Sequence, residues 1–234
     1  KEGRIGFRTQ IGCPENCFFC VEGDTPVLFH DPDAVGKELY NLKNKGYNQF
    51  HLCDSEFNLN LEHSINVCRA MLSVAGPVNW ALYMKAEPVS SELFSLLRQT
   101  GASLITLSLD TCKDARNGFE PLENFFRYAD DQGIPVMIDL SVGYPYEEMS
   151  HTKAMLDFLN TQPVVSVGVN SYYRVYPHTP LFHIIRENED LHPHLINPPF
   201  ANNYVYPVFF SYFRYEEVLS MLPDRNKFRM EGFE

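Results

Sequence analysis

Three cysteines stand within eight residues near the start of this chain, in the stretch 9–20 (TQIGCPENCFFC). Cys13, Cys17 and Cys20 follow the spacing C-x3-C-x2-C, and no fourth cysteine stands beside them. Thiols clustered in this way are typical of a metal centre in a reducing compartment. With 234 residues, 44% of them hydrophobic, the chain can form a sizeable core without disulfide bonds. We therefore expect free thiols, a metal centre and a cytoplasmic location.

Two kinds of metal centre fit three cysteines on one loop. A structural zinc site needs four ligands, and His30 or Cys53 could supply the fourth. A [4Fe-4S] cluster is commonly held by four thiolates. Three cysteines would hold three of its irons and leave the fourth iron open to a ligand that is not protein.

Apolar segments typical of strands alternate with segments of helical periodicity over the first three quarters of the chain. We expect strands at residues 5–11, 49–54, 79–85, 103–110, 135–142 and 164–174, with helices between them. Strict alternation predicts parallel strands joined by right-handed crossovers, in an α/β fold. A partial barrel and an open doubly wound sheet both satisfy this pattern. No glycine-rich nucleotide-binding motif of the G-x-G-x-x-G or P-loop kind is present.

Residues 175–234 have a different composition, rich in Pro, Asn, Tyr and Phe. We expect one helix there, near 215–222, in an extension that covers the barrel opening or contacts a partner. The core is accordingly placed at 1–177 and the aromatic-rich C-terminal extension at 178–234. A net charge of -11 argues against a nucleic-acid partner. No apolar run reaches the roughly 20 residues that would cross a bilayer.

Polar side chains follow every expected strand. Functional groups of parallel α/β folds gather at the carboxyl ends of the strands. An arginine that ends an apolar strand, as Arg174 does, is costly to bury unless it is paired, and Asp139 and Glu147 are its candidate partners. We expect the following residues to share one site with the cysteines: Asp54, Ser55, Glu56, Tyr83, Lys85, Ser108, Asp110, Asp139 and Arg174.

The cysteine loop after the first strand resembles that of the radical S-adenosylmethionine superfamily. The segments RTQIGCPENCFFC, CDSEFN and YRVYPHTPL resemble the branch whose members carry a cobalamin-binding domain ahead of the barrel. The resemblance covers residues 4–177 and implies a partial (βα)6 TIM-like barrel. Relatives of this branch have a GGPGET-like turn after the fifth strand, where this chain has GYPYEE at 143–148. No cobalamin-binding segment precedes Lys1 here, so we expect that half to be absent or on another chain.

The resemblance also implies cofactors and residue roles. Cys13, Cys17 and Cys20 would hold a [4Fe-4S] cluster, whose open iron S-adenosylmethionine chelates before reductive cleavage to a 5'-deoxyadenosyl radical. The implied cofactor contacts are Phe19 with the adenine, Asp54, Ser55 and Glu56 with the methionine amino group, Ser108 and Asp110 with the ribose or carboxylate, and Arg174 with the methionine carboxylate. Among the other cysteines, Cys53 and Cys68 are expected in the core, and Cys112 is a candidate hydrogen donor.

Three functions fit this resemblance. The first is a cobalamin-dependent methyltransferase that acts on a small-molecule or lipid-like substrate, with a flavodoxin- or ferredoxin-type electron donor. The second is a radical enzyme that uses no cobalamin. The third is a non-catalytic iron–sulfur module, which the polar strand ends argue against.

Overall fold

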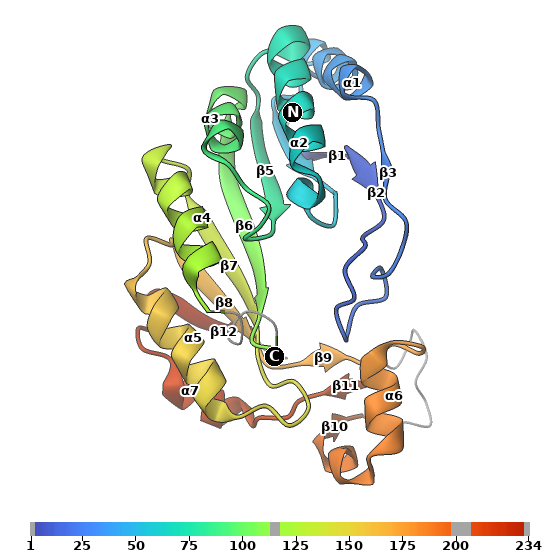
Figure 1. Ribbon diagram of the computed structural model, residues 1–234, viewed down its shortest axis with the longest axis vertical. Helices are drawn as coiled ribbons and strands as arrows, with labels where there is room; N and C mark the ends of the chain where they lie inside the picture. Colours follow the sequence, from blue (N-terminus) through green and yellow to red (C-terminus); the bar gives the residue numbers. More distant parts are fainter. Residues whose placement is uncertain (1–2, 113–117, 198–206, 232–234) are drawn as a thin grey trace.

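A seven-stranded parallel sheet forms the centre of the computed structural model, which describes residues 3–112, 118–197 and 207–231 (Figure 1). The strand order is β1-β4-β5-β6-β7-β8-β12, and each neighbouring pair is parallel. Within the described residues β1 and β12 do not pair, so the sheet is an open, partial barrel. The strands are β1 (Ile5–Phe7), β4 (Gln49–Leu52), β5 (Asn79–Met84), β6 (Ala102–Asp110), β7 (Val136–Ser141), β8 (Ser166–Asn170) and β12 (Phe228–Glu231).

Helices follow one another along the outer side of this sheet (Figure 1). Local sequence sets their ends: Asp31 and Ser90 accept hydrogen bonds from the first turns of α1 and α3. Gly101 ends α3 in the left-handed conformation, with φ of 88°. The helices that cover the sheet are α1 (Pro32–Asn44), α2 (Leu61–Ala70), α3 (Ser91–Thr100), α4 (Glu120–Asp131), α5 (Met149–Thr161) and α7 (Tyr215–Met221).

The two faces of the sheet differ in polarity. In β7, Val136, Ile138 and Leu140 are buried in the hydrophobic core, whereas Asp139 and Ser141 on the other face are only half-buried. The period of two along a strand produces this alternation. We call the face turned away from the core the inner face. The alternating α/β pattern of the sequence is thus confirmed, with one strand more than expected.

The seventh strand, β12, comes from the C-terminal extension. It pairs with β8 in the register Phe228↔Val167 to Glu231↔Asn170. Phe228 is 1% exposed and joins the main core. A four-residue strand with two charged residues carries little periodicity, so the sequence did not reveal it. The helix expected near 215–222 is confirmed as α7 (Tyr215–Met221).

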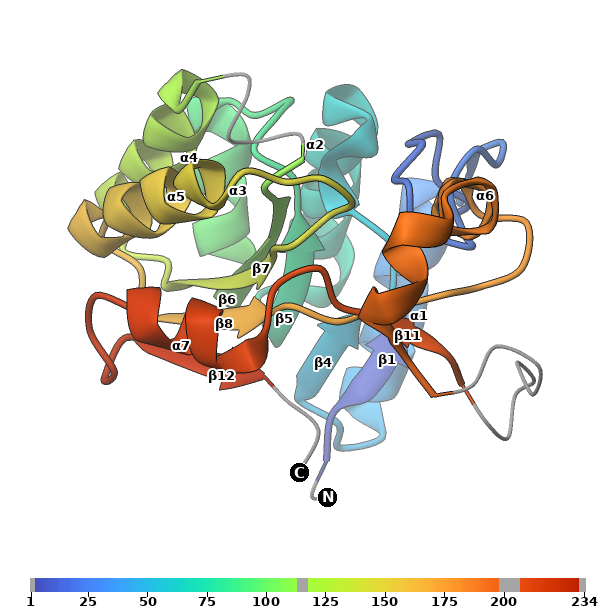
Figure 2. The same ribbon diagram turned by 90° about the horizontal axis from the view of Figure 1, so that it is seen from below.

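The remainder of the extension packs beside the cysteine loop rather than over the helices (Figure 2). A small antiparallel sheet has the order β10-β11-β9, formed by Leu195–Ile196, Phe209–Phe210 and Tyr173–Arg174. It packs with α6 (Pro180–Glu187) and the 3-10 helix η3 (Glu189–His194) around a second hydrophobic cluster. Phe18 and Phe19 pack against this cluster, and Leu181 N donates to Phe18 O at 2.8 Å. The extension therefore supports the cysteine loop from outside the barrel.

None of the helices in the described ranges is long and apolar enough to cross a membrane.

Candidate cofactor site

The cysteine loop lies between two short antiparallel strands, β2 (Gln10–Ile11) and β3 (Leu28–Phe29). The strand expected at 5–11 therefore breaks between β1 and β2. Thr25 closes the base of the loop: its N donates to Cys13 O at 2.9 Å, and its Oγ1 accepts from Cys13 N at 2.9 Å. Cys20 N donates to Cys17 O at 3.0 Å, which makes a tight turn. The chain path thus brings the three cysteines onto one short loop.

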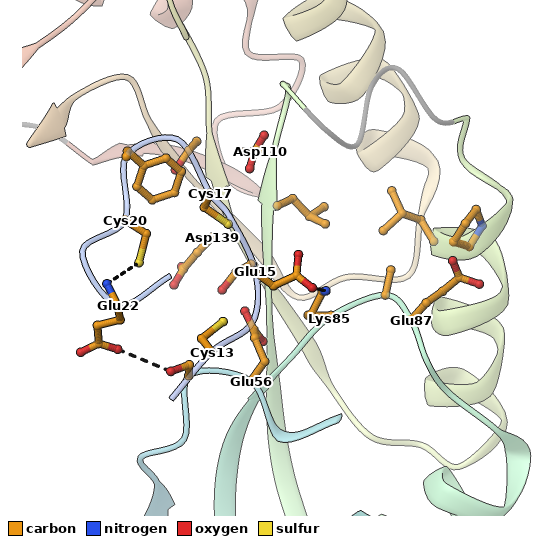
Figure 3. A pocket seen from close by; sticks show the side chains of 18 of the residues that line it. Cys13, Glu15, Cys17, Cys20, Glu22, Glu56, Lys85, Glu87, Asp110 and Asp139 are labelled. Carbon is orange, nitrogen blue, oxygen red and sulfur yellow. Dashed lines mark hydrogen bonds and ion pairs between the residues drawn. The ribbon is translucent and has the colours of Figure 1, made fainter. Parts of the chain in front are cut away.

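A cavity of about 580 Å³ opens between this loop and the carboxyl ends of the strands (Figure 3). Cys13, Cys17 and Cys20 all line it, and none of the three forms a disulfide bond. Parallel strands present their carboxyl ends at one edge, which explains why residues far apart in sequence meet here. The polar residues that line it with the cysteines are Glu15, Glu22, Ser55, Glu56, Lys85, Glu87, Ser108, Asp110, Asp139 and Ser141.

The thiol set fits an iron–sulfur cluster better than zinc. Neither His30 nor Cys53, the two candidate fourth ligands for zinc, lines the cavity. In the described part of the chain, no three His, Cys, Asp or Glu side chains are arranged to hold one ion. The three thiols of a four-iron cluster each bind a different iron, so they need not converge on a point. Burial raises the pKa of Cys13, with a smaller rise from the charge of Glu15, so its ionisation would need a metal to offset this cost.

Phe19 lines the cavity and stands on an aromatic base. Its ring centroid is 5.2 Å from that of Phe18 and 5.2 Å from that of Tyr173. Tyr173 is buried, and its ring centroid also lies 5.0 Å from that of Phe18. Phe19 is thereby held with part of its ring toward the cavity, and its contact with an adenine stays a prediction.

Asp54 has a structural position outside the cavity, contrary to the expected cofactor contact. Its Oδ1 accepts from Thr9 N at 2.8 Å and from Gln10 N at 3.2 Å, and its Oδ2 accepts from Thr9 Oγ1. Asp54 is 6% exposed, and burial raises its pKa against the effect of these hydrogen bonds. The carboxylate therefore fixes the turn between β1 and β2, from which the cysteine loop departs.

Glu56 lines the cavity next to Ser55. Its Oε2 is fully buried and, within the described residues, has no hydrogen-bond partner. Burial raises the pKa of Glu56 to about 8, against a smaller opposite effect of the Lys85 charge. A buried carboxyl oxygen without a partner is costly, so this geometry suits a cationic group of a ligand. Its expected contact with an amino group is consistent with this position and stays a prediction.

Lys85 is the one basic residue among the described lining residues, and the sequence analysis expected it at the site without assigning it a cofactor contact. It forms an ion pair with Glu15 inside the cysteine loop. Asn58 fixes its backbone: Asn58 Oδ1 accepts from Lys85 N at 2.9 Å, and Asn58 Nδ2 donates to Lys85 O at 2.9 Å. The signal in the sequence was a lysine at a strand end, which by itself does not reveal a partner 70 residues away.

Ser108 and Asp110 both line the cavity at the end of β6, as expected. Arg174 does not line it. After β8 the chain leaves the main sheet, and Arg174 in β9 lies with its guanidinium 4.7 Å from the ring centroid of Tyr176. The pairing of Arg174 with Asp139 or Glu147 is not found among the described contacts. A cation–π contact outside the barrel takes its place.

The turn after β7 is organised by Glu147. Its carboxylate accepts from Gly143 N at 2.5 Å, Tyr144 N at 3.1 Å and Thr152 Oγ1 at 2.6 Å. Burial raises the pKa of Glu147 against these hydrogen bonds. The GYPYEE turn thus has a defined shape, although it departs from the GGPGET-like pattern.

The other cysteines lie outside the cavity lining. Cys68 is buried in the core as expected, whereas Cys53 is exposed, and its core placement was wrong. Cys112 is half-buried and does not line the cavity, so its role as a hydrogen donor stays a prediction.

Known proteins share this arrangement. The sequence pattern of the Radical SAM superfamily matches residues 7–159. A tryptophan 2-C-methyltransferase of Streptomyces laurentii is 26% identical over an alignment of 216 residues, and the match covers 81% of this chain and 36% of that protein. The chain thus spans about a third of the length of this curated relative.

Solved structures show the same fold. The radical S-adenosylmethionine methyltransferase TsrM from Kitasatospora setae, with cobalamin and a [4Fe-4S] cluster bound, matches with a TM-score of 0.81 and 20% identity, over 98% of this chain and 55% of that chain. The cobalamin-dependent S-adenosylmethionine radical enzyme OxsB matches with a TM-score of 0.66 and 15% identity, over 90% of this chain and 39% of that one. These likenesses confirm the partial barrel. With the family pattern over residues 7–159 and three cysteines on the loop after β1, the chain belongs to the radical SAM superfamily.

Proposed function

We propose that this chain is the cluster- and S-adenosylmethionine-binding barrel of a cobalamin-dependent methyltransferase that acts on a small molecule. The observation that carries the proposal is that Cys13, Cys17 and Cys20 meet Glu56 around one cavity, where the buried Glu56 Oε2 has no hydrogen-bond partner within the described residues. The methyltransferase class rests on the curated relative, which is a tryptophan methyltransferase by name. The assignment of cobalamin rests on the TsrM structure, which has cobalamin bound.

Different residues of the chain would bind the cluster and the separate groups of S-adenosylmethionine. The three thiolates would hold three irons, and the cluster when bound supplies one electron to S-adenosylmethionine. Glu56 would accept hydrogen bonds from the methionine amino group, and Ser108 and Asp110 from the ribose. Phe19, held by Phe18 and Tyr173, would present its ring to the adenine. Lys85 would meet the methionine carboxylate in place of Arg174; the support is that Lys85 is the one basic residue among the described lining residues.

An electron donor of the flavodoxin or ferredoxin type would have access to the cluster. Cys17 and Cys20 are only half-buried, so the loop is within reach of a docked protein. Exposed apolar side chains stand on the flanking strands and loop, which suits a transient protein contact: Ile11, Val21, Leu28 and Phe29.

The experiment that tests the proposal is anaerobic reconstitution with iron and sulfide, followed by reaction with S-adenosylmethionine, reductant, cobalamin and candidate acceptors such as tryptophan. A methyltransferase converts S-adenosylmethionine to S-adenosylhomocysteine in a cobalamin-dependent manner and yields a methylated acceptor. Formation of 5'-deoxyadenosine without cobalamin would support the cobalamin-independent radical enzyme instead. A four-iron cluster with neither product would support the non-catalytic module, and zinc in place of iron would refute all three.

A further inference from the structure

The inner face of the sheet carries a row of mostly polar positions, of which the proposed cofactor contacts use only Ser108. Across four neighbouring strands the register places Ser108 beside Asp139, Asp139 beside Gly168, and Gly168 beside Arg229. The inner face of a parallel barrel is normally filled by branched apolar side chains. A polar row at this place leaves room that water or a polar ligand must fill.

Asp139 lines the cavity (Figure 3), as its neighbour Ser108 does, but it has no part in the proposed cofactor contacts. Tyr83 from β5 donates a hydrogen bond from its hydroxyl to Asp139 Oδ2 at 3.3 Å. Within the described residues, Asp139 Oδ1 accepts no hydrogen bond. Tyr83 thus fixes one oxygen of the carboxylate, and the other remains available to a ligand in the cavity.

Glu231 brings a second carboxylate to the same row. A Cβ atom at Gly168 would lie 2.6 Å from Glu231 Oε1, so the glycine makes the space into which this side chain folds. Burial is the main cause that raises the pKa of Asp139, and the negative charge of Glu231 raises it further. Arg229 Nη2 lies 3.4 Å from Glu231 Oε1. Because the Arg229 side chain is 62% exposed, solvent weakens the effect of its positive charge. The row therefore keeps an excess of negative charge.

We propose that Asp139, with Tyr83 and Glu231 beside it, binds a protonated amino group of the substrate. This inference rests on the proposed function, because it takes the cavity to admit a small-molecule acceptor. An ammonium group has three donors, and the free Asp139 oxygen, the Glu231 carboxylate and the Tyr83 hydroxyl oxygen offer acceptors from three strands. The substrate class is a primary amine, and amino acids belong to it. The methionine amino group of the cofactor is assigned separately to Glu56.

The test measures ligand binding to the whole reconstituted chain under anaerobic conditions, by saturation-transfer NMR. The probes are matched pairs: the common amino acids and tryptamine, each beside its analogue without the amine, such as indole-3-propionate for tryptophan. We expect binding from amine-bearing members only. In Asp139→Asn the dissociation constant of such a binder should rise about tenfold or more, because a charge-assisted hydrogen bond is lost. Tyr83→Phe should weaken it a few-fold through the loss of the hydroxyl that orients Asp139.

Asp130→Asn is the charge-matched control, since Asp130 is exposed near the end of α4 and should leave binding unchanged. The inference is overturned if no amine-bearing probe binds, if the analogues bind equally well, or if Asp139→Asn binds amines as the wild type does. It is also overturned if Asp139→Asn weakens S-adenosylmethionine alone, because Asp139 would then serve the cofactor. A cluster and S-adenosylhomocysteine formation that persist beside any of these results would leave the proposed function standing.

Discussion

Lys85, directly after β5, forms an ion pair with Glu15, which lies between the first two cysteines of the loop. Asn58 clamps the Lys85 backbone from the connection between β4 and α2. The lysine therefore ties the cysteine loop to the rigid sheet from inside the barrel, while Leu181 supports Phe18 from outside. A loop fixed on two sides holds its thiols in place before any metal binds.

This ion pair should contribute measurably to stability. A double-mutant cycle with Glu15→Gln and Lys85→Met should give a coupling energy of about 1 kcal/mol, because both side chains are only 30% exposed. The matched control is Lys153 with Asp157, whose side chains are 63% and 56% exposed. We expect about 0.3 to 0.5 kcal/mol for that pair in urea unfolding of the cluster-free protein. Equal couplings would show that Lys85 does not anchor the loop.

Each cysteine of the loop should be required for the cluster. Cys13→Ala, Cys17→Ala or Cys20→Ala should abolish the four-iron cluster after anaerobic reconstitution, because two thiolates on this loop cannot hold it. Iron and sulfide analysis with electron paramagnetic resonance after reduction measures this. Cys53→Ala is the control, since Cys53 is exposed and outside the cavity, and it should retain full iron content. A full cluster in any loop variant would contradict the assignment.

Asp54 should act on stability rather than on cofactor affinity. Asp54→Ala should lower the free energy of unfolding by about 2 to 4 kcal/mol, because it leaves the buried Thr9 and Gln10 amides unpaired. Asp54→Asn should be milder, since one oxygen can still accept from Thr9 N. The exposed control Asp130→Ala should stay within about 0.5 kcal/mol of wild type. A normal unfolding curve for Asp54→Ala with weakened S-adenosylmethionine binding would instead restore the cofactor role.

Glu56 should make the cluster-free protein less stable as pH rises. The pKa of Glu56 is about 8 in the folded protein and has a reference value of 4.5, so its protonated form favours folding. Its stabilising effect is complete below about pH 4.5 and is lost as pH rises toward 8. The Gln side chain of Glu56→Gln cannot ionise, so this variant does not lose stability in the same way. Its unfolding free energy should exceed that of the wild type by an amount that grows to the order of 2 to 4 kcal/mol at about pH 8. Urea unfolding of both proteins at about pH 5.5 and pH 8 measures this difference in unfolding free energy. A difference that does not change with pH would refute the prediction.

The strand β12 should be integral to the core although it lies in the extension. Phe228→Ala should lower the unfolding free energy by about 3 to 5 kcal/mol, because the ring is 1% exposed. Arg229→Ala on the same strand is the control and should change it by no more than about 0.5 kcal/mol. A small effect of Phe228→Ala would show that β12 is a detachable tail.

The sequence was informative wherever chemistry is local. The cysteine spacing, the caps at Asp31 and Ser90, and the alternation of strands and helices each depend on residues close together in the chain, and the structure confirms them. The resemblance of the loop also led to the family, which the match over residues 7–159 confirms. The cavity contains Ser55, Glu56, Ser108 and Asp110 as expected, because carboxyl strand ends meet at one edge.

The sequence failed where a role depends on direction or on a distant partner. Asp54 and Glu56 are two residues apart, yet one turns to the Thr9 backbone and the other to the cavity. Arg174 ends an expected strand, but the chain leaves the sheet before reaching it. The partner of Lys85 in its ion pair is Glu15, which lies 70 residues away in the sequence.

By itself, then, the sequence determined the parallel α/β order and the three-thiol loop, because both follow from short-range pattern. Only the tertiary structure decided that β12 completes the sheet, that Glu231 folds over Gly168, and that Tyr83 holds Asp139 on the inner face. The physical reason is that side-chain partners across a sheet are set by strand order and register. Strand order and register depend on the packing of the whole core, so no single segment of the sequence predicts them.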